Sequence, residues 1–350
     1  MANLVVENKV LTSPKEIRAD VKQAPSSLAI WAAMISVYIV WGSTYLAIRF
    51  AVQTMPPFLM AAARFLIAGT VLYVFRRARG DVTPTKLEWR SAAIVGILLL
   101  VGGNGGVVWA EQHVVSSVAA LLVGSSPLWM ILIDALRPGG KRPSWPSVAG
   151  VLVGFAGIVL LVGPGELSGG ADKIDPVGAA VLIFAALLWS IGSLYSRNAA
   201  LPSSPLLGTG MEMLAGGVVL LVLGALTGEF SRLNLAGISA PSLWGLAYLV
   251  VFGAWVGFGA YTWLLRVAPI SFVSTYAYVN PVVAIVMGYL VAAEPITSRT
   301  LIAAAIIVGS VALTKVANQN GKRNGLAATD MLCQYSAPAD DPPIGARYRS

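Results

Sequence analysis

The stretch WGSTYLAIRFAVQTMPP at residues 41–57 returns in outline as WSIGSLYSRNAALPSSP at residues 189–205. Three residues recur 148 positions later: Trp41 as Trp189, Arg49 as Arg197 and Pro57 as Pro205. Other residues recur at nearly the same spacing: Ser117 as Ser271, Pro127 as Pro281, Pro143 as Pro295 and Gly157 as Gly309. The chain therefore contains two copies of one unit. Because we expect five membrane spans in each copy, the second copy must enter the membrane from the opposite side, as in many secondary transporters.

The composition indicates that lipid covers much of the surface. Of the 350 residues, 57% are hydrophobic and only 11% are charged, whereas a soluble domain carries about 25% charged residues. The chain has one cysteine, Cys333, and one histidine, His113, which excludes a disulfide framework and a metal site built from these residues. We expect no cofactor and no metal.

Ten segments are apolar enough to predict transmembrane helices, since about 20 apolar residues span about 30 Å of hydrocarbon. The fifth and tenth are short for a full span. The segments are Leu28–Phe50, Phe58–Phe75, Ser91–Ala110, Ser117–Leu136, Val148–Val162, Pro176–Tyr195, Leu206–Leu226, Leu243–Leu265, Ser271–Val291 and Leu301–Val316. The predicted fold class is an all-α membrane protein with ten transmembrane helices arranged as two inverted five-helix repeats.

The basic residues predict the orientation. If both termini are cytoplasmic, nineteen of the 24 Lys and Arg residues fall in inner segments, and only Lys173, Arg232 and Arg299 fall in outer loops. This asymmetry follows the positive-inside rule and predicts a multi-pass protein of the cytoplasmic membrane. It also explains the net charge of +8 without a nucleic-acid partner.

The same pattern predicts the domain organisation. We expect a cytoplasmic N-terminal tail at 1–27, a first repeat at 28–162, an outer linker at 163–175, a second repeat at 176–316 and a disordered cytoplasmic tail at 317–350. The N-terminal tail carries several charges and lacks the long apolar core of a signal peptide. One chain holds both repeats, so a monomer suffices, and a homodimer stays open.

The ordered motifs of both halves resemble the drug/metabolite transporter superfamily, in its EamA branch of ten-span carriers. The resemblance covers nearly everything from Ala29 to Val316. It rests on Trp41-Gly42-Ser43-Thr44-Tyr45, Ala63-Arg64-Phe65-Leu66-Ile67-Ala68-Gly69, Asn104-Gly105-Gly106, Trp109-Ala110-Glu111-Gln112, Ser126-Pro127-Leu128, Tyr278-Val279-Asn280-Pro281 and Glu294-Pro295. The family's usual Gly-Glu pair after the fourth span is replaced here by residues 137–141, RPGGK.

This resemblance implies an inner-membrane exporter or importer of small organic solutes. Members of the family handle amino acids, sugars, nucleotide-linked compounds and drugs, so the resemblance leaves the substrate open. It also implies a central cavity lined mainly by the first, third, fourth and sixth helices and their counterparts.

Aromatic and basic residues share one face of the first span. Trp41, Tyr45 and Arg49 are spaced four apart, and four residues return to the same helix face. Aromatic rings on a cavity wall would stack on a substrate or a cation, whereas rings and arginines at helix ends anchor a helix at the interface. We expect Trp41, Tyr45 and the equivalent Trp189 on the cavity wall, and Arg49 at the interface.

Two charges lie within predicted spans. Arg64 is about seven residues into the second span, and Glu212 holds the matching place in the seventh. A charge at membrane depth costs at least ~2.5–3.5 kcal/mol and is a functional candidate by default. Arg64 either contacts substrate or caps carbonyls of a neighbouring helix. Glu212 is the candidate for proton coupling. The two enter from opposite faces, which argues against a direct ion pair.

Polar residues and prolines complete the candidate substrate site. Asn104 lies among glycines in an apolar span and bonds either a neighbouring helix or the substrate. Prolines inside membrane helices free backbone carbonyls and mark bends and sites, which predicts bent fourth and ninth spans. The residues expected near these bends and the cavity are Ser126, Trp129, Tyr276 and Asn280. We expect Glu111, at the end of the third span, to be solvated, with a place at an outer gate as the alternative.

These patterns favour a secondary carrier, with a small molecule and the lipid bilayer as partners. An intramembrane enzyme is the first alternative, and no nucleophile–base or metal-ligand spacing supports it. A facilitative pore is the second, and no repeated filter motif is present. Without a Gly-x-x-x-x-Gly-Lys loop, ATP is not expected to drive transport. Accumulation of solute against a gradient distinguishes a carrier from a pore.

Overall fold

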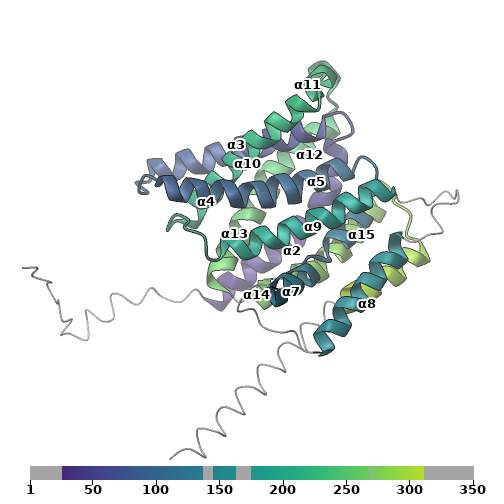
Figure 1. Ribbon diagram of the computed structural model, residues 1–350. Helices are drawn as coiled ribbons and strands as arrows, with labels where there is room; N and C mark the ends of the chain where they lie inside the picture. Colours follow the sequence, from purple (N-terminus) through teal and green to yellow (C-terminus); the bar gives the residue numbers. More distant parts are fainter. Residues whose placement is uncertain (1–25, 137–144, 163–174, 269, 274, 311–350) are drawn as a thin grey trace, which may run out of the picture.

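The computed structural model describes residues 26–136, 145–162, 175–268, 270–273 and 275–310, and these residues form helices joined by short turns (Figure 1). No β-strand occurs among them. The predicted tails and the predicted outer linker lie almost wholly outside the described residues. In chain order the helices are α2 (Ser27–Ala51), α3 (Pro57–Ala78), α4 (Lys86–Gly96), η1 (Ile97–Gly105), α5 (Gly106–Ala110), α6 (Ser116–Val123), α7 (Ser126–Leu136), α8 (Trp145–Val162), α9 (Pro176–Ser196), α10 (Pro205–Leu226), α11 (Glu229–Arg232), η3 (Leu235–Gly237), α12 (Ala240–Tyr248), η4 (Leu249–Phe258), α13 (Gly259–Val267), α14 (Ile270–Val273) and α15 (Tyr276–Ala292).

Seven helices are long and apolar enough to cross a bilayer, counting Lys86–Ala110, Ser116–Leu136 and Ala240–Val267 as one helix each. Three shorter apolar helices, Val148–Gly157, Val279–Ala292 and Ser298–Ser310, lie in the fifth, ninth and tenth predicted segments. The all-helical fold and the membrane-spanning character predicted from the sequence are confirmed.

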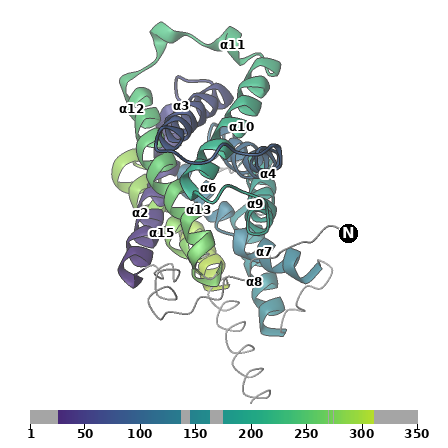
Figure 2. The same ribbon diagram turned by 90° about the vertical axis from the view of Figure 1, so that its left-hand side faces the viewer.

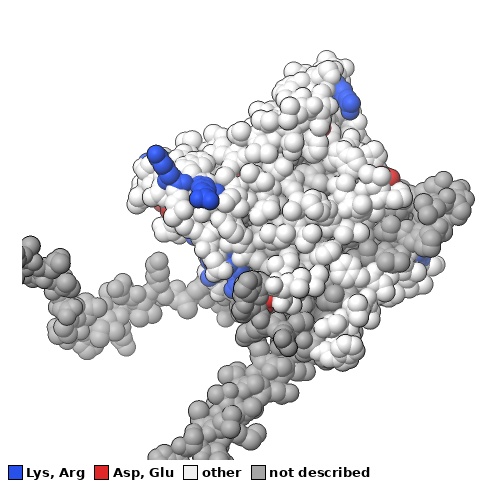
Figure 3. Space-filling view, in the orientation of Figure 1, with Lys and Arg blue, Asp and Glu red and all other residues white. Residues whose placement is uncertain are grey.

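The surface of the helix bundle is apolar. Large hydrophobic side chains such as Ile39, Phe184 and Val222 are at least half exposed. The space-filling view shows a broad uncharged belt, with basic side chains gathered at the end of the molecule where α3 meets α4 (Figure 3). Lipid tails would cover such a belt, because about 25 cal/mol per Å² favours removal of apolar surface from water.

Breaks in the fourth and ninth segments occur near the predicted prolines. The fourth segment is interrupted at Gly124 and Ser125, between α6 and α7, and Pro127 follows in the first turn of α7. The ninth is interrupted before α15, and Pro281 lies inside α15. The third and eighth segments both widen into a π-helix, η1 and η4. Such widened turns are rare and occur frequently at functional sites.

Helices α3 and α10, the second helices of the two copies, pack together in opposite directions. A Cβ on Gly69 would lie 2.9 Å from the nitrogen of Leu214, and a Cβ on Gly217 would lie 3.1 Å from the nitrogen of Leu66. These two contacts exchange under the 148-residue repeat. As residue numbers rise along α3, the contacting numbers fall along α10, so the two helices are antiparallel. Small residues allow this close approach.

The two halves interlock through their first helices. Helix α2 packs against η4, α13 and α15 of the second half, and α9 packs against η1, α5, α6 and α7 of the first half. Figure 2 shows α2 and α15 side by side, on the opposite side of the bundle from α4 and α9. The first helix of each half therefore packs against the other half, and both helices contribute residues to the candidate site.

Candidate substrate cavity

A cavity lies between the two halves. Its empty space is about 540 Å³, counting the part that opens toward solvent, and the centre of a water molecule can reach about 50 Å³ of it. The cavity is therefore narrow in this conformation. Its walls are formed by α2, α3, η1, α5, α6, α9 and α15. The lining residues are Trp41, Thr44, Tyr45, Ile48, Arg64, Gly103, Asn104, Val107, Val123, Ala185, Trp189, Tyr276 and Asn280.

One wall of the cavity is aromatic. The rings of Trp41 and Trp189 meet edge to face, with centroids 5.4 Å apart and an interplanar angle of 83°. Tyr276 packs edge-on against Trp41 at 5.7 Å, and Tyr261 and Phe258 pack behind the two tryptophans. Edge-to-face pairs of this kind contribute about 0.5–1.5 kcal/mol beyond area burial. The indole Nε1 of Trp189 has no hydrogen-bond partner among the described residues.

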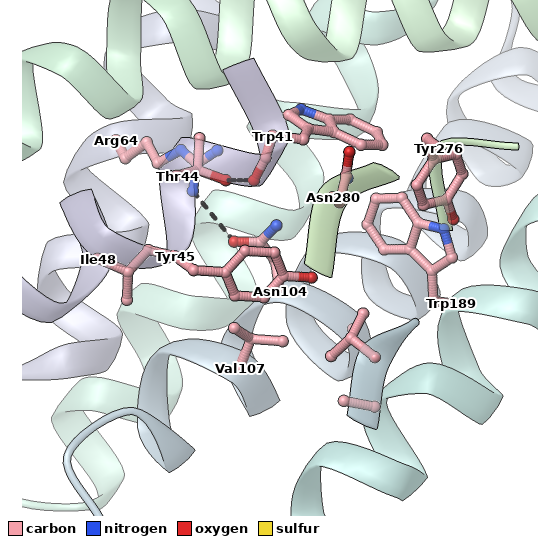
Figure 4. Close-up of a pocket in the computed structure, with 13 residues that line it drawn as sticks. Trp41, Thr44, Tyr45, Ile48, Arg64, Asn104, Val107, Trp189, Tyr276 and Asn280 are labelled. Carbon is pink, nitrogen blue, oxygen red and sulfur yellow. Dashed lines mark hydrogen bonds between the residues drawn. The ribbon is translucent and has the colours of Figure 1, made fainter. Parts of the chain in front are cut away.

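The opposite wall carries the cavity's charge. Arg64 is only 1% exposed, and its Nη1 donates to Oδ1 of Asn104 at 3.1 Å. Figure 4 shows Arg64, Thr44 and Asn104 together on one side and Trp189 and Tyr276 on the other. Asn104 thus bonds a neighbouring helix while lining the cavity.

Asn280 and Tyr45 lie between these two walls (Figure 4). The amide of Asn280 is satisfied when its nitrogen donates to the carbonyl oxygens of Tyr38 and Tyr276, at 3.2 and 3.3 Å. These two bonds tie the Asn280 side chain to the backbone of both α2 and α15. The sequence-predicted residues that the structure brings together in the cavity are Trp41, Tyr45, Arg64, Asn104, Trp189, Tyr276 and Asn280.

Ser126 and Trp129 lie outside the cavity lining. The hydroxyl of Ser126 donates to the carbonyl of Val123 at 2.6 Å, and its carbonyl accepts from Ser190 at 2.9 Å. Trp129 packs edge-on against Phe155 of α8 at 5.0 Å. Both residues follow the break in the fourth segment, where the structure gives them packing roles between helices.

Glu212 is buried in α10 and lies outside the cavity lining. It is 3% exposed, and its Oε2 has no hydrogen-bond partner among the described residues. No Arg64–Glu212 ion pair occurs in the part of the chain that the structure describes. Glu212, the candidate for proton coupling, therefore lies apart from the candidate substrate-binding residues that line the cavity.

A polar cluster lies at the end of the bundle where α2 and α5 end and α6 begins. Glu294 accepts hydrogen bonds from the backbone nitrogens of Ser116 and Ser117, both at 3.2 Å, at the N-terminus of α6. It also accepts from the Ser116 hydroxyl and forms an ion pair with Arg49. A carboxylate is stabilised at a helix N-terminus. The sequence did not predict the ion pair of Arg49, whose partner Glu294 comes from a segment 245 residues away.

Glu111 also belongs to this cluster. It is 5% exposed, and neither carboxylate oxygen has a hydrogen-bond partner among the described residues. The expectation that Glu111 is solvated was wrong. Burial, and next the charge of Glu294, raise the pKa of Glu111 well above its usual value. Burial would also raise the pKa of Glu294, but its hydrogen bonds from Ser116, Ser117 and Arg49 outweigh burial and lower it.

The sequence as a whole identifies the class of protein that carries this cavity. The family model of the EamA-like transporter family matches residues 27–163 and 176–316, one match for each copy. The chain belongs to the EamA-like transporter family. It is thus a multi-pass membrane protein of a transporter family.

Relatives of this EamA-like chain support the same assignment. The inner membrane transporter YedA of Escherichia coli K12 is 37% identical over 290 residues, which cover 82% of this chain and 90% of YedA. The chloroplastic WAT1-related protein At3g02690 of Arabidopsis thaliana is 25% identical over 294 residues, covering 83% of this chain and 70% of that protein. A protein of known crystal structure shares the fold with a TM-score of 0.58 at 21% identity, over 83% of this chain and 98% of that one.

Several cavity residues of this EamA-like chain were missed by reasoning from the sequence. Thr44 lies one residue before Tyr45, and its hydroxyl is held by the carbonyl of Trp41 at 2.7 Å. Gly103 and Val107 flank Asn104 on η1 and α5, and a Cβ on Gly103 would meet the Trp189 ring at 2.8 Å. The spacing of Val107, three residues after Asn104, is the signal that places it on the same helix face.

Proposed function

We propose that the protein is a secondary active carrier that moves a small organic solute across the cytoplasmic membrane by alternating access. The observation that carries this proposal is the contact between Trp41 and Trp189, whose rings lie 5.4 Å apart on the wall of one cavity. The two residues hold equivalent positions in the two copies. A site at the junction of two repeats, lined by both, is the arrangement through which rocking of one half against the other exposes the site to each side in turn.

The proposed topology is ten spans in two inverted five-helix repeats, with both termini cytoplasmic. The antiparallel packing of α3 against α10 supports inversion, because equivalent helices of parallel repeats would cross the membrane in the same direction. The basic turn between α3 and α4 would then face the cytoplasm, and α11 would face outward. Labelling tests this in a background with Cys333 replaced by Ser: a cysteine at Thr83 should react with an impermeant maleimide only in inverted vesicles, and one at Ser231 only in intact cells. The reverse pattern contradicts the topology.

Proton coupling through Glu212 is the second element of the proposal. A buried carboxylate without a hydrogen-bonded cation can exchange a proton during a transport cycle, and Glu212 forms no hydrogen bond with a cation among the described residues. Glu212→Gln should abolish the dependence of transport on a pH gradient, whereas Glu212→Asp, which keeps the carboxylate, should retain part of it. Unchanged gradient dependence in the Gln variant removes Glu212 from the mechanism.

The direction of net transport is proposed to be export. A metabolite screen that compares the medium of cells with and without overexpressed protein should show one or a few solutes enriched outside. The enriched compound is then tested for uptake into proteoliposomes with an imposed pH gradient. Depletion of a compound from the medium would instead assign import, and absence of any difference together with absence of vesicle uptake would contradict a carrier function.

A further inference from the structure

Arg64, the charged residue of the cavity, has no carboxylate partner in the part of the chain that the structure describes. Arg64 is almost completely buried, yet no Asp or Glu is among the residues that line the cavity. The ion pairs of the described residues are Arg49–Glu294 and Arg76–Asp81, and neither includes Arg64. Buried charges in proteins are normally paired. Arg64 is therefore a positive charge whose counter-ion is missing from the described part of the chain.

The guanidinium of Arg64 also has unused hydrogen-bond donors. A guanidinium carries five N–H groups, and the described residues accept one hydrogen bond from it, at Asn104. Within the described ranges, its Nε has no hydrogen-bond partner. The ring of Phe65 lies 4.7 Å from the guanidinium carbon and covers one face, which leaves the donors in the guanidinium plane free for another group.

A purely structural role for Arg64 is not what the contacts indicate. An arginine that caps a neighbouring helix donates to backbone carbonyls, and Arg64 donates to no backbone carbonyl among the described residues. Both π-helices approach it, η1 through Asn104 and η4 through Gly253, where a Cβ would lie 2.9 Å from Nη2. These contacts position the guanidinium without occupying all of its hydrogen-bond donors.

We propose that the solute of the cavity is a net anion: a small molecule with one carboxylate-type group, which pairs with Arg64, and a flat apolar body, which lies against Trp41 and Trp189. This proposal rests on the proposed carrier function and specifies its substrate class. A guanidinium matches the planar geometry of a carboxylate through two parallel hydrogen bonds. A zwitterion or a cation is disfavoured, because the cavity offers no carboxylate to receive an ammonium group, and the Asn104 oxygen is already occupied by Arg64.

Three molecules that share one ring and differ in charge test the proposal directly. Phenylacetate is an anion, phenylalanine a zwitterion and phenethylamine a cation at neutral pH. Each is added over a concentration series to the purified full-length protein in detergent, and the unfolding temperature is recorded. A ligand that binds the folded state raises this temperature with its concentration. Phenylacetate should raise it, and the other two should raise it less or not at all.

Two variants link the effect to Arg64. Asn104→Asp replaces the amide with a carboxylate of the same shape, 3.1 Å from Nη1 of Arg64. This carboxylate would pair with the guanidinium in place of the solute. Phenylacetate binding should therefore weaken by roughly tenfold to a hundredfold, as for loss of a hydrogen bond to a charged group. Arg64→Gln should have the same effect. The matched control is Arg197→Gln, which removes an exposed arginine at the end of α9 and should leave binding unchanged.

The possible outcomes separate this proposal from the carrier function. Equal or stronger stabilisation by phenylalanine or phenethylamine, no stabilisation by phenylacetate, or full phenylacetate binding by Asn104→Asp would each overturn an anionic substrate. Vesicle uptake of a zwitterionic compound found in the metabolite screen would keep the carrier function and overturn the substrate class. If Arg64→Gln fails to fold, the Asn104→Asp variant, which retains the arginine, still decides.

Discussion

Trp41 and Trp189, which occupy equivalent positions 148 residues apart in the two copies, meet edge to face with ring centroids 5.4 Å apart. Two equivalent residues of a two-fold arrangement touch each other only close to the axis that relates them. In an inverted repeat that axis lies in the membrane plane. The pair therefore marks the centre of the proposed transport site, with Arg64 on one side and Tyr276 on the other.

Removal of either central tryptophan should impair transport more than folding. Trp41→Ala and Trp189→Ala are each expected to lower vesicle uptake at least tenfold. In a double-mutant cycle of unfolding free energies the pair should show coupling of about 0.5–1.5 kcal/mol. Trp244→Ala is the matched control, because Trp244 is 76% exposed. Normal uptake by both single variants would show that the cavity is not the transport site.

The close contact of α3 and α10 should not tolerate a methyl group. In Gly69→Ala the new Cβ would lie 2.9 Å from backbone atoms of Gly210 and Leu214, so the helices must separate, at a cost of about 1–3 kcal/mol. The control is Gly309→Ala, whose Cβ meets nothing within 4 Å among the described residues. Unfolding temperatures in detergent should fall for the first variant and not for the second. Equal temperatures would argue against the antiparallel contact.

Glu294 and Glu111 of the polar cluster should make the free energy of unfolding depend on pH in opposite directions. The lowered pKa of Glu294 means that its contribution is present above its ordinary pKa, about 4.3, and is lost as pH falls through the lower folded value. The raised pKa of Glu111 means that its contribution is complete below its ordinary pKa and is lost as pH rises through the higher folded value.

Thermal unfolding between acidic and neutral pH checks both signs. Glu294→Gln should be less stable than the parent at neutral pH, and the difference should shrink below about pH 4, where the parent carboxylate takes up its proton. The unfolding temperature of Glu111→Gln should rise relative to that of the parent as pH increases toward neutral. A parallel pH profile for parent and variant would show that the carboxylate in question does not have the environment described.

The cluster around Glu294 should also restrict access to the cavity from its end of the bundle. In a background with Cys333 replaced by Ser, a cysteine at Val107 would line the cavity. The Glu294 carboxylate pairs with Arg49 and accepts hydrogen bonds from the N-terminus of α6. Because Glu294→Gln removes this charge, an impermeant maleimide should label the cysteine faster in intact cells. An unchanged rate would assign Glu294 a role in stability alone.

The sequence predicted the helical spans and most of the cavity because both leave strong local signals. Apolar segments of membrane length identify helices without tertiary information, and the recurrence of Trp41 as Trp189 identified two positions that the structure brings into contact. Arg64 and Asn104 were recognisable because polar groups in apolar spans are costly. The fourth segment breaks at Gly124 and Ser125, next to Pro127, whereas Pro281 of the ninth segment lies inside the continuous helix α15.

Contacts between distant segments were not predictable in the same way. Arg49 and Glu111 lie at the ends of helices, which in sequence is typical of a solvated position. Arg49 instead pairs with the distant Glu294, and Glu111 is buried. Ser126 and Trp129 follow a helix break, but uniformly apolar helices give no periodic signal to tell which face meets the cavity. Their contacts with Ser190 and Phe155 depend on how whole helices pack.

The central claim is that this cavity carries a solute from one side of the membrane to the other. The most direct measurement is uptake of the compound from the metabolite screen into proteoliposomes with an imposed pH gradient. We predict saturable accumulation above the outside concentration, with uptake lowered at least tenfold in Trp41→Ala and retained in Trp244→Ala. Flux that only equilibrates the compound and never saturates, or uptake equal to that of empty liposomes, would contradict the account.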